Sequence, residues 1–255
     1  MDIQAHDDQR VRHIILDRPA KRNALTLEMC KDIVTEVRSS ESRGDIGCTL
    51  ISATGSVFCA GMDLKEAPNA DELSQAHEQL FTLGARAVKP IVIAVNGAAL
   101  AGGLGLVAQG HVVLASPNAE FGLPEVRIGF WPFVVYRALE RALGKRKALE
   151  LSLTGTLFDV QQALAWGLVH SSHPVAELDD ASLAVAQNIS NASPMAISLG
   201  MQYVRDAEGK SLREAGQIAA RLRGHLMASP HYKEGTAAFK EKREPRWPTI
   251  SADPF

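Results

Sequence analysis

The chain has 255 residues, of which 46% are apolar, and its 27 basic and 29 acidic side chains give a formal net charge of −2. A chain of this length can bury roughly 70–75% of its unfolded surface, which is enough for one large domain with an appendage. The composition excludes a disordered chain and a polybasic arm, so we expect a folded protein without a nucleic-acid partner.

Strand-like and helix-like patterns alternate in the first half of the chain. They predict strands at residues 11–16, 48–51 and 91–95, and helices at residues 25–37 and 71–88. This alternation implies crossover connections and a sheet that helices cover.

After about residue 131 the pattern is mainly helical. Helices are predicted at residues 134–143, 147–153, 160–166, 178–189, 194–205 and 212–227, with one further strand at residues 167–170. No internal repeat or Pro/Gly/Ser-rich linker divides the chain. The predicted fold class is therefore α/β, with one α/β core and a helical C-terminal region from about residue 175.

Residues 90–119 contain no Asp, Glu, Lys or Arg. A membrane-spanning helix needs about 20 predominantly apolar residues, but several glycines interrupt this segment, and each costs roughly 1 kcal/mol relative to alanine in a helix. Residues 91–95 and 112–115 are rich in β-branched side chains, which is typical of buried strands. We therefore predict a buried strand–turn–helix–strand unit and no membrane span.

Two glycine-containing turns, residues 58–64 and 96–103, follow predicted strands. Each places small residues where a helix opens, and there the backbone N–H groups lack intrahelical acceptors and carry the positive end of the helix dipole. Two such donors that converge on one point would form an oxyanion hole, in which one donor typically contributes ~2.7–4 kcal/mol. The spacing alone leaves open that both segments are ordinary tight turns.

Glu125 lies among apolar residues in the segment 121–129. Partial desolvation would raise the pKa of its carboxyl group towards the range useful for general acid/base catalysis. The alternative is a glutamate at the start of a helix that pairs with Arg127 or Arg137. The sequence by itself leaves both interpretations open.

Residues 103–108 match the G-x-G-x-x-A pattern of a dinucleotide-binding turn. In such a turn the first glycine directly follows a strand, whereas here residues 96–102 intervene. A serine hydrolase is not indicated, because the sequence has no G-x-S-x-G motif. Dinucleotide binding is kept as a second enzymatic hypothesis.

Cysteine, histidine and N-terminal patterns also limit the function. The three cysteines, Cys30, Cys48 and Cys59, lack metal-ligand spacing, and their odd number argues against a disulfide framework. His170 and His173 have no third ligand nearby in the sequence, so no metal is expected. The first residues do not read as a signal peptide, and the expected location is cytoplasmic.

Taken together, these segments resemble the crotonase superfamily, whose best-known members are enoyl-CoA hydratases and isomerases. The resemblance covers nearly the whole chain. Each motif alone is weak, but their common order is specific. The motifs are residues 16–19 with 21–25, 58–64, 95–103, 121–125, 153–155 with 163–169, and 239–243.

The resemblance implies a core of stacked ββα units at residues 1–175. It implies that residues 176–255 form a helical region that serves trimerisation and covers the CoA site. Members of the family usually assemble as trimers or dimers of trimers, so a homotrimer or a dimer of trimers is expected. The implied substrate is an acyl-CoA thioester, and coenzyme A enters only as part of it, with no other cofactor.

By the same resemblance, the N–H groups of Met62 and Gly102 would hold the thioester oxygen and stabilise an enolate. Glu125 would be the acid/base carboxylate that moves a proton at the α or γ carbon. A further set of residues is implied to contact the substrate: Ala24, Ala60, Asp63 and Leu64 along the CoA path, and Lys21, Arg22 and Lys242 at its phosphates.

Two positions depart from the pattern of hydratases with two catalytic carboxylates. The second glutamate of those enzymes corresponds to Gly105, and a Gly-rich segment is replaced by residues 131–137, in which Trp131 and Phe133 would narrow or dry the acyl end. Addition of water favours two carboxylates, whereas one base can remove and redeliver a single proton. Relatives with a single glutamate include both isomerases and hydratases, so the choice stays open. The sequence therefore predicts an enoyl-CoA hydratase or isomerase with a single glutamate. The alternative is a catalytically degenerate subunit that binds acyl-CoA or serves assembly.

Overall fold

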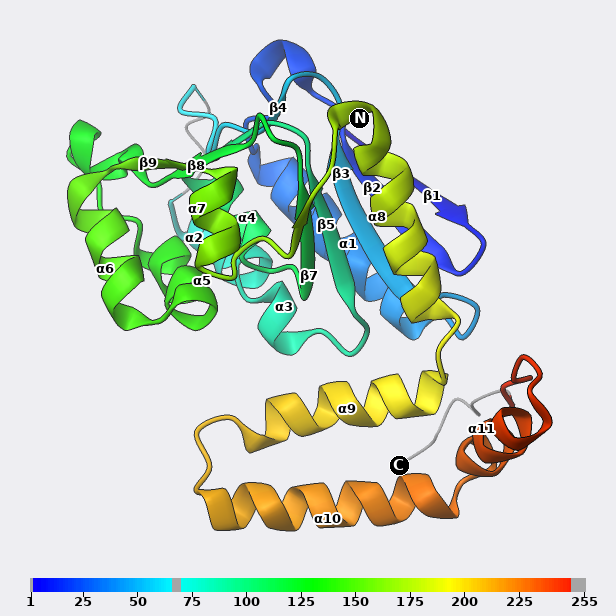
Figure 1. Ribbon diagram of the computed structural model, residues 1–255. Coiled ribbons are helices and arrows are strands. Elements are labelled where there is room, and N and C mark those ends of the chain that lie inside the picture. The colour runs from blue at the N-terminus through cyan, green and yellow to red at the C-terminus, as the bar shows by residue number, and fades with distance from the viewer. Residues whose placement is uncertain (1, 66–69, 249–255) are drawn as a thin grey trace.

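The computed structural model describes residues 2–65 and 70–248. It has an α/β core with two sheets, and three C-terminal helices form an arm beside this core (Figure 1). No helix within the described residues is long and apolar enough to cross a membrane. The fold class is the predicted one, and the charge-free segment lies inside the core.

The larger sheet has six strands in the order β1-β2-β3-β5-β7-β10. β1 runs antiparallel to β2, and the other neighbouring strands run parallel. The strands are β1 (Ile3–Asp8), β2 (Val11–Leu16), β3 (Cys48–Ala53), β5 (Ile91–Val95), β7 (Val112–Ala115) and β10 (Ser171–Ser172).

Helices cover both faces of this sheet, which explains its continuous apolar strands. In β5, Ile91, Ile93 and Val95 pack in the main core, on the side of α1 (Leu27–Ser42). Val92 and Ala94 point to the opposite face and pack towards α8 (Val175–Ser190). Successive side chains of a strand point to opposite faces, so a strand covered on both sides is apolar throughout.

The smaller sheet has the order β4-β6-β8-β9, with β9 antiparallel to β8. Its short strands and the turns after them carry most of the candidate site. The strands are β4 (Val57–Cys59), β6 (Ala98–Leu100), β8 (Glu120–Gly122) and β9 (Leu157–Asp159).

Short helices surround this smaller sheet. The remaining elements of the core are η1 (Pro19–Lys21), α2 (Ala70–Leu80), α3 (Leu83–Arg86), α4 (Gly102–Val107), η2 (Pro124–Ile128), α5 (Phe133–Leu143), α6 (Lys145–Thr154) and α7 (Val160–Ala165). The helix predicted at residues 71–88 is therefore divided into α2 and α3. The strand predicted at residues 167–170 was wrong, because the chain there forms turns and β10 begins only at Ser171.

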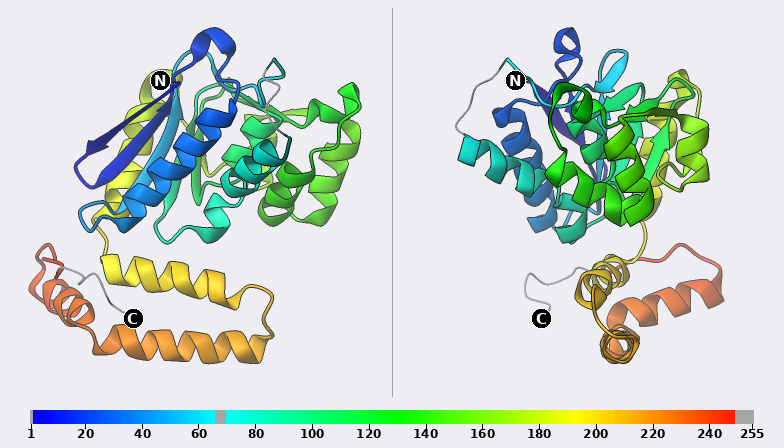
Figure 2. Two further views of the ribbon diagram at one scale, coloured as in Figure 1. Left: turned by 180° about the vertical axis from the view of Figure 1, so that it is seen from behind. Right: turned by 90° about the vertical axis from the view of Figure 1, so that its left-hand side faces the viewer.

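The arm consists of α9 (Pro194–Ala207), α10 (Leu212–Ala228) and α11 (Pro230–Glu241). The views of Figure 2 show α9 and α10 side by side and the arm displaced from the sheets. α8 also belongs to the predicted helical region, but it packs on the larger sheet. The part of the chain that stands away from the core therefore starts at α9.

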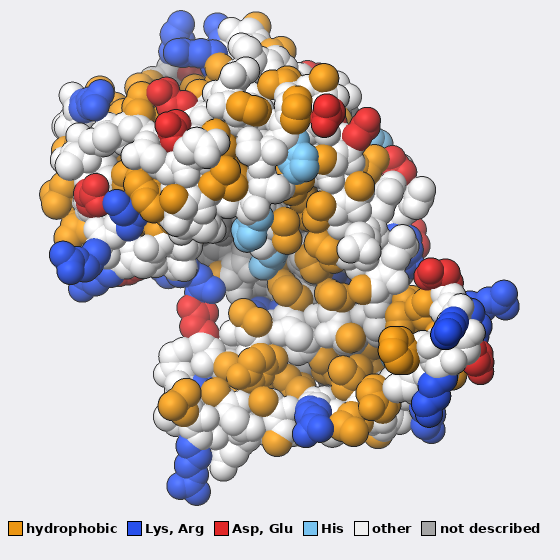
Figure 3. Space-filling model, in the orientation of Figure 1, with side chains coloured by type: hydrophobic (Ala, Val, Ile, Leu, Met, Phe, Trp, Pro, Cys, Tyr) orange, Lys and Arg blue, Asp and Glu red, His pale blue; other side chains and the backbone are white. Residues whose placement is uncertain are grey.

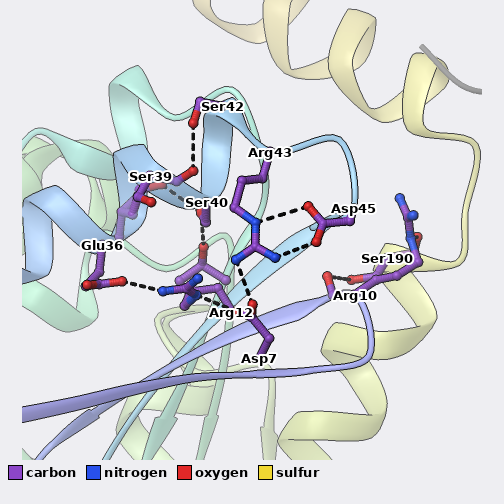
Figure 4. Close-up of polar contacts among 12 residues, drawn as sticks. Asp7, Arg10, Arg12, Glu36, Ser39, Ser40, Ser42, Arg43, Asp45 and Ser190 are labelled. Carbon is purple, nitrogen blue, oxygen red and sulfur yellow. Dashed lines mark hydrogen bonds and ion pairs between the residues drawn. The ribbon is translucent and has the colours of Figure 1, made fainter.

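A polar cluster ties the β1–β2 hairpin to the end of α1, far from the candidate site (Figure 4). Arg12 contacts Asp7 at 2.6 Å and Glu36 at 2.5 Å. Arg43 contacts the same Asp7 at 2.6 Å and also pairs with Asp45. These ion pairs hold the β1–β2 edge of the larger sheet against the end of α1.

Candidate active site

Three neighbouring strands of the smaller sheet, β4, β6 and β8, run parallel, so their carboxyl ends meet at one edge. Met62 follows β4, Gly102 follows β6 and Glu125 follows β8, each within three residues of the strand end. The Ala101 N–H donates a hydrogen bond of 2.9 Å to the Gly122 carbonyl, which extends the β6–β8 pairing towards this edge. The fold thus brings these three predicted residues to one edge.

The turns after β4 and β6 lie in direct contact at Gly61. Its φ of +97° is in the left-handed region that favours glycine. A Cβ atom at Gly61 would lie 2.7 Å from the Ala101 Cβ and 3.3 Å from the Gly102 nitrogen. Gly61 therefore allows the backbones beside Met62 and Gly102 to approach each other.

The N–H groups of Met62 and Gly102 have no hydrogen-bond acceptor within the described part of the chain. Leu25 bonds to the residues on either side of Met62, because its N–H donates to the Gly61 carbonyl at 2.7 Å and its carbonyl accepts from Asp63 at 2.9 Å. Gly102 is the first residue of α4, where an N–H group has no intrahelical acceptor. Both donors are available to an oxygen atom of a ligand.

Glu125 is buried, with 8% of its surface exposed, in η2. Its Oε2 atom is buried and has no hydrogen-bond partner among the described residues. Burial raises the pKa of this carboxyl group above its ordinary value. The pairing considered with Arg137 does not form, since Arg137 instead lies 3.8 Å from Glu78.

Gly105 faces a wall of apolar side chains. A Cβ atom at this position would lie 2.9 Å from two ring atoms of Phe81 and 3.0 Å from the Val135 Cγ2. Both side chains are nearly fully buried. The position that carries a second glutamate in two-carboxylate hydratases therefore has no room for one here.

The packing of α4 does not support the dinucleotide-binding hypothesis. All six residues of this helix are buried. A Cβ atom at Gly103 would lie 2.2 Å from the Cys59 carbonyl oxygen, so this glycine permits close packing of α4 on β4. The segment 103–108 thus presents no exposed turn to a pyrophosphate. The described residues also contain no cluster of three His, Cys, Asp or Glu side chains that could hold a metal.

The predicted CoA-contacting residues lie on two turns that Arg18 joins. Its Nη1 donates to the Ala24 carbonyl at 3.1 Å and to the Asp63 Oδ2 at 2.7 Å. The Ala60 N–H donates to the Arg22 carbonyl at 3.0 Å. The hydrogen bond from Arg18 lowers the pKa of Asp63. Ala24, Ala60 and Asp63 are thus brought together, and Asp63 holds the two turns in place.

Of the other predicted contact residues, three lie on these two turns and two lie elsewhere. Lys21, Arg22 and Leu64 are exposed on the same two turns. Trp131 is half-buried between η2 and α5, with its ring centroid 6.2 Å from that of Tyr136. Lys242 follows α11 at the far side of the molecule from η1, the dark-blue turn at the top of Figure 1, so the fold of one chain does not bring it to the others.

Three residues that position the site were not singled out from the sequence. Arg18 and Asn23 occurred only inside a motif, and Phe81 lay inside a predicted helix. The buried Asn23 side chain donates to the Thr54 and Val57 carbonyls at 2.9 and 2.8 Å and so fixes the turn before β4. Asn23 has a φ of +50°, a conformation in which asparagine is enriched among non-glycine residues, so the residue type itself was a signal for a tight turn here.

The sequence was compared with protein families and with curated relatives. The enoyl-CoA hydratase/isomerase family model matches residues 6–249. The mouse enoyl-CoA hydratase domain-containing protein 3, mitochondrial, is 32% identical over 243 residues, covering 93% of this chain and 81% of that protein. The Aspergillus fumigatus mevalonyl-coenzyme A hydratase is 35% identical over 242 residues, covering 92% and 90%. Because the mouse relative is mitochondrial, the cytoplasmic location stays a prediction.

Solved structures agree with these matches. The human enoyl coenzyme A hydratase domain-containing protein 3 has a TM-score of 0.91 with 30% identity, covering 97% of this chain and 100% of that chain. The Mycobacterium smegmatis enoyl-CoA hydratase has a TM-score of 0.90 with 26% identity, covering 97% and 99%. The resemblance of this chain to the crotonase superfamily is therefore confirmed, and the chain belongs to the enoyl-CoA hydratase/isomerase family.

Proposed function

We propose that this protein is an enzyme that hydrates an enoyl-CoA or shifts its double bond through a thioester enolate, with one glutamate as acid and base. The observation that carries the proposal is the convergence of Met62, Gly102 and Glu125 at the ends of three adjacent parallel strands. Family membership supplies the substrate class, and the free N–H groups and the buried carboxyl group supply the chemistry.

The two N–H groups would act on the thioester carbonyl oxygen. As a proton leaves the α carbon, negative charge develops on this oxygen, and each donor aimed at it typically contributes ~2.7–4 kcal/mol to the transition state. Glu125 would accept that proton and return it to the α or γ carbon. Its raised pKa suits both steps, because a group whose pKa lies closer to the working pH gives and takes a proton more readily.

A double-bond shift is the reaction that the packing around Gly105 favours. Phe81 and Val135 fill the space that a second carboxylate at position 105 would need, so in this proposal Glu125 alone handles the proton transfers. Isomerisation needs one base that removes a proton and redelivers it, whereas addition of water also needs the water to be positioned and activated. We therefore place isomerisation ahead of hydration.

The alternative function is a degenerate subunit that binds acyl-CoA without turnover or serves assembly. Its support is the missing second glutamate at Gly105. The unpaired Oε2 of Glu125 favours the catalytic function over this alternative. A buried polar atom without a hydrogen-bond partner lowers stability and is rare in native proteins unless it serves a function.

The deciding experiment measures turnover of 2-enoyl-CoA and of 3-enoyl-CoA by the purified protein in separate assays. We expect conversion of the 3-enoyl to the 2-enoyl thioester, with deuterium from heavy water incorporated at the α or γ carbon. Formation of a 3-hydroxyacyl-CoA alone would instead establish hydration. Tight binding without turnover or exchange would establish the degenerate subunit.

CoA would bind over the two turns that Arg18 joins, with Lys21 and Arg22 at its phosphates and Ala24, Ala60, Asp63 and Leu64 along its path. Replacing Arg18 by Gln removes the ion-pair partner of Asp63 and the guanidinium donor to the Ala24 carbonyl. We expect kcat/KM to fall roughly tenfold to 10²-fold, because small displacements of positioning groups have effects of this size.

The matched control is Arg43→Gln, which breaks ion pairs to Asp7 and Asp45 away from the site and should leave kcat/KM unchanged. The pKa of Asp63 is lowered by Arg18, so any contribution of its charge to activity persists to acidic pH and is lost as the pH falls through that pKa. In Arg18→Gln this loss should start at a higher pH. Equal kinetics of the two arginine variants would contradict this role of Arg18.

We further propose that the arm assembles copies of the chain into a trimer or a dimer of trimers. Hydrophobic side chains gather on the arm in Figure 3. Val204, Leu212 and Phe239 are exposed there, Leu212 to 95%. Lys242 would then reach the CoA of a neighbouring copy. Sedimentation of the native protein as a monomer would contradict this proposal.

A further inference from the structure

Phe81 covers the face of α4 that carries Gly102 and Gly105. This residue lies between α2 and α3, and 4% of its surface is exposed. Its Cζ atom is 3.3 Å from the position of a Cβ at Gly102, and two further ring atoms are 2.9 Å from that of a Cβ at Gly105. The ring therefore extends along the first turn of α4, from Gly102 to Gly105.

Phe81 is also among the residues that line an open cavity of about 430 Å³. This cavity lies between α3, α5, α9 and the end of α4, in the region where Figure 3 shows a recess between core and arm. Ala108, Ala138, Met201 and Val204 form much of its apolar wall, and Arg141 and Glu208 pair at its rim. Phe81 is thus a partition between the candidate site and this cavity.

Neighbouring side chains hold the partition in place. His77, one helical turn before Phe81, packs against its ring with centroids 5.4 Å apart at an interplanar angle of 48°. Burial lowers the pKa of His77, so the imidazole is neutral at neutral pH and packs without a charge. The Val135 Cγ2 atom also lies 3.0 Å from the position of a Cβ at Gly105. These neighbours keep the Phe81 ring in one position. In a close-packed interior even the addition or removal of one methylene group changes stability.

We propose that Phe81 closes the acyl end of the site and restricts the enzyme to short-chain acyl-CoA thioesters, and that a smaller side chain there joins the site to the cavity and admits longer chains. This inference rests on the proposed function, which places the thioester carbonyl at the Gly102 N–H. Acyl carbons that leave the carbonyl along α4 then meet the ring of Phe81. An alkyl chain in the joined space would contact the alanine, methionine and valine side chains of the cavity.

The test compares Phe81→Leu and Phe81→Ala with the native protein across a series of 3-enoyl-CoA thioesters from butenoyl to hexadecenoyl. The 2-enoyl-CoA series of the same lengths replaces it if the protein hydrates its substrate. The native kcat/KM should decrease with chain length. In each folded Phe81 variant the ratio of long-chain to short-chain kcat/KM should rise at least about tenfold, which corresponds to 1.4 kcal/mol. Phe81→Leu removes less volume and keeps the test decisive if Phe81→Ala does not fold.

The matched control is Phe158→Leu, which truncates another buried phenylalanine of the same core that packs against Phe121 and Trp166. Its chain-length ratio should equal that of the native protein. Dissociation constants of saturated acyl-CoAs of the same lengths give a second readout that does not need turnover. Absence of turnover with a chain-length preference in binding would refute the proposed reaction and keep this inference.

Two results would overturn the role of Phe81. One is a native protein that binds and converts long chains as well as short ones. The other is an unchanged ratio in both folded Phe81 variants. A protein that binds no acyl-CoA of any length would overturn the inference and the proposed function together.

Discussion

Replacing Glu125 by Gln is expected to lower turnover by about 10²- to 10⁴-fold, the range over which a positioned acid/base group contributes. The amide has nearly the shape of the carboxyl group but can neither take nor give the proton. Binding of the acyl-CoA should change little, because the N–H groups of Met62 and Gly102 remain in place. Turnover and deuterium exchange at the α carbon are the measurements, with the dissociation constant of a saturated acyl-CoA as reference.

The control for this variant is Glu120→Gln. Glu120 belongs to the same strand, β8, but its side chain is exposed. Its loss should leave turnover unchanged. Equal activity of the Glu125 and Glu120 variants would mean that another group moves the proton, and the mechanism proposed here would then be wrong.

The pH dependence of kcat/KM of the native protein provides an independent test of the role of Glu125. Burial raises the pKa of its carboxyl group, so Glu125 is protonated at a pH at which an exposed glutamate stays ionised. Because base catalysis needs the ionised form, kcat/KM should fall as the pH decreases through this raised pKa. The acid limb should therefore lie above the ordinary range of glutamate, and it should be absent from the residual activity of Glu125→Gln.

The second large effect is expected from Gly61→Ala. The added methyl group meets the Ala101 Cβ at 2.7 Å and the Gly102 nitrogen at 3.3 Å, so the turn after β6 must move. We expect kcat to fall by about 10²- to 10³-fold, as when one oxyanion donor is lost. The left-handed conformation adds a stability cost of ~1–2 kcal/mol.

Gly167→Ala separates these two effects. Gly167 also has a positive φ, +77°, but nothing lies within 4 Å of a Cβ atom there. Urea unfolding should show a loss of stability from backbone strain in both variants, larger in Gly61→Ala because of the added contact, while only Gly61→Ala loses turnover. If the two variants keep the same kcat, the contact between the turns does not set the position of the oxyanion donors.

Local patterns in the sequence predicted most of the fold. The β-branched run of β5 and the spacing of apolar residues in α1 indicate their structure directly, and Thr26 marks the start of α1 because its side chain accepts from the Met29 N–H at 3.1 Å. The three-residue strands of the smaller sheet were not predicted, since so few residues give no period. The first strand, β1, was also missed, because most of its side chains are exposed.

The candidate site was predictable where the residue type indicates the chemistry, as at Glu125 and in the glycine-containing turns. Roles that depend on which segments touch in space were not. Arg18 acts on Asp63, 45 positions away in the sequence. Phe81 lies at the break between α2 and α3 and contacts Gly105 from there, and the single helix predicted at residues 71–88 hid this contact.

The fit of Phe81 against Gly105 also restricts how this enzyme can change over evolutionary time. A glutamate at position 105 alone collides with a buried ring, and overpacking of this kind destabilises a core. A smaller side chain at position 81 alone leaves a void, which is costly as well. Each substitution alone lowers stability, so a lineage that acquires both passes through a less stable intermediate. Packing outside the proposed reacting groups thereby disfavours a carboxylate at position 105.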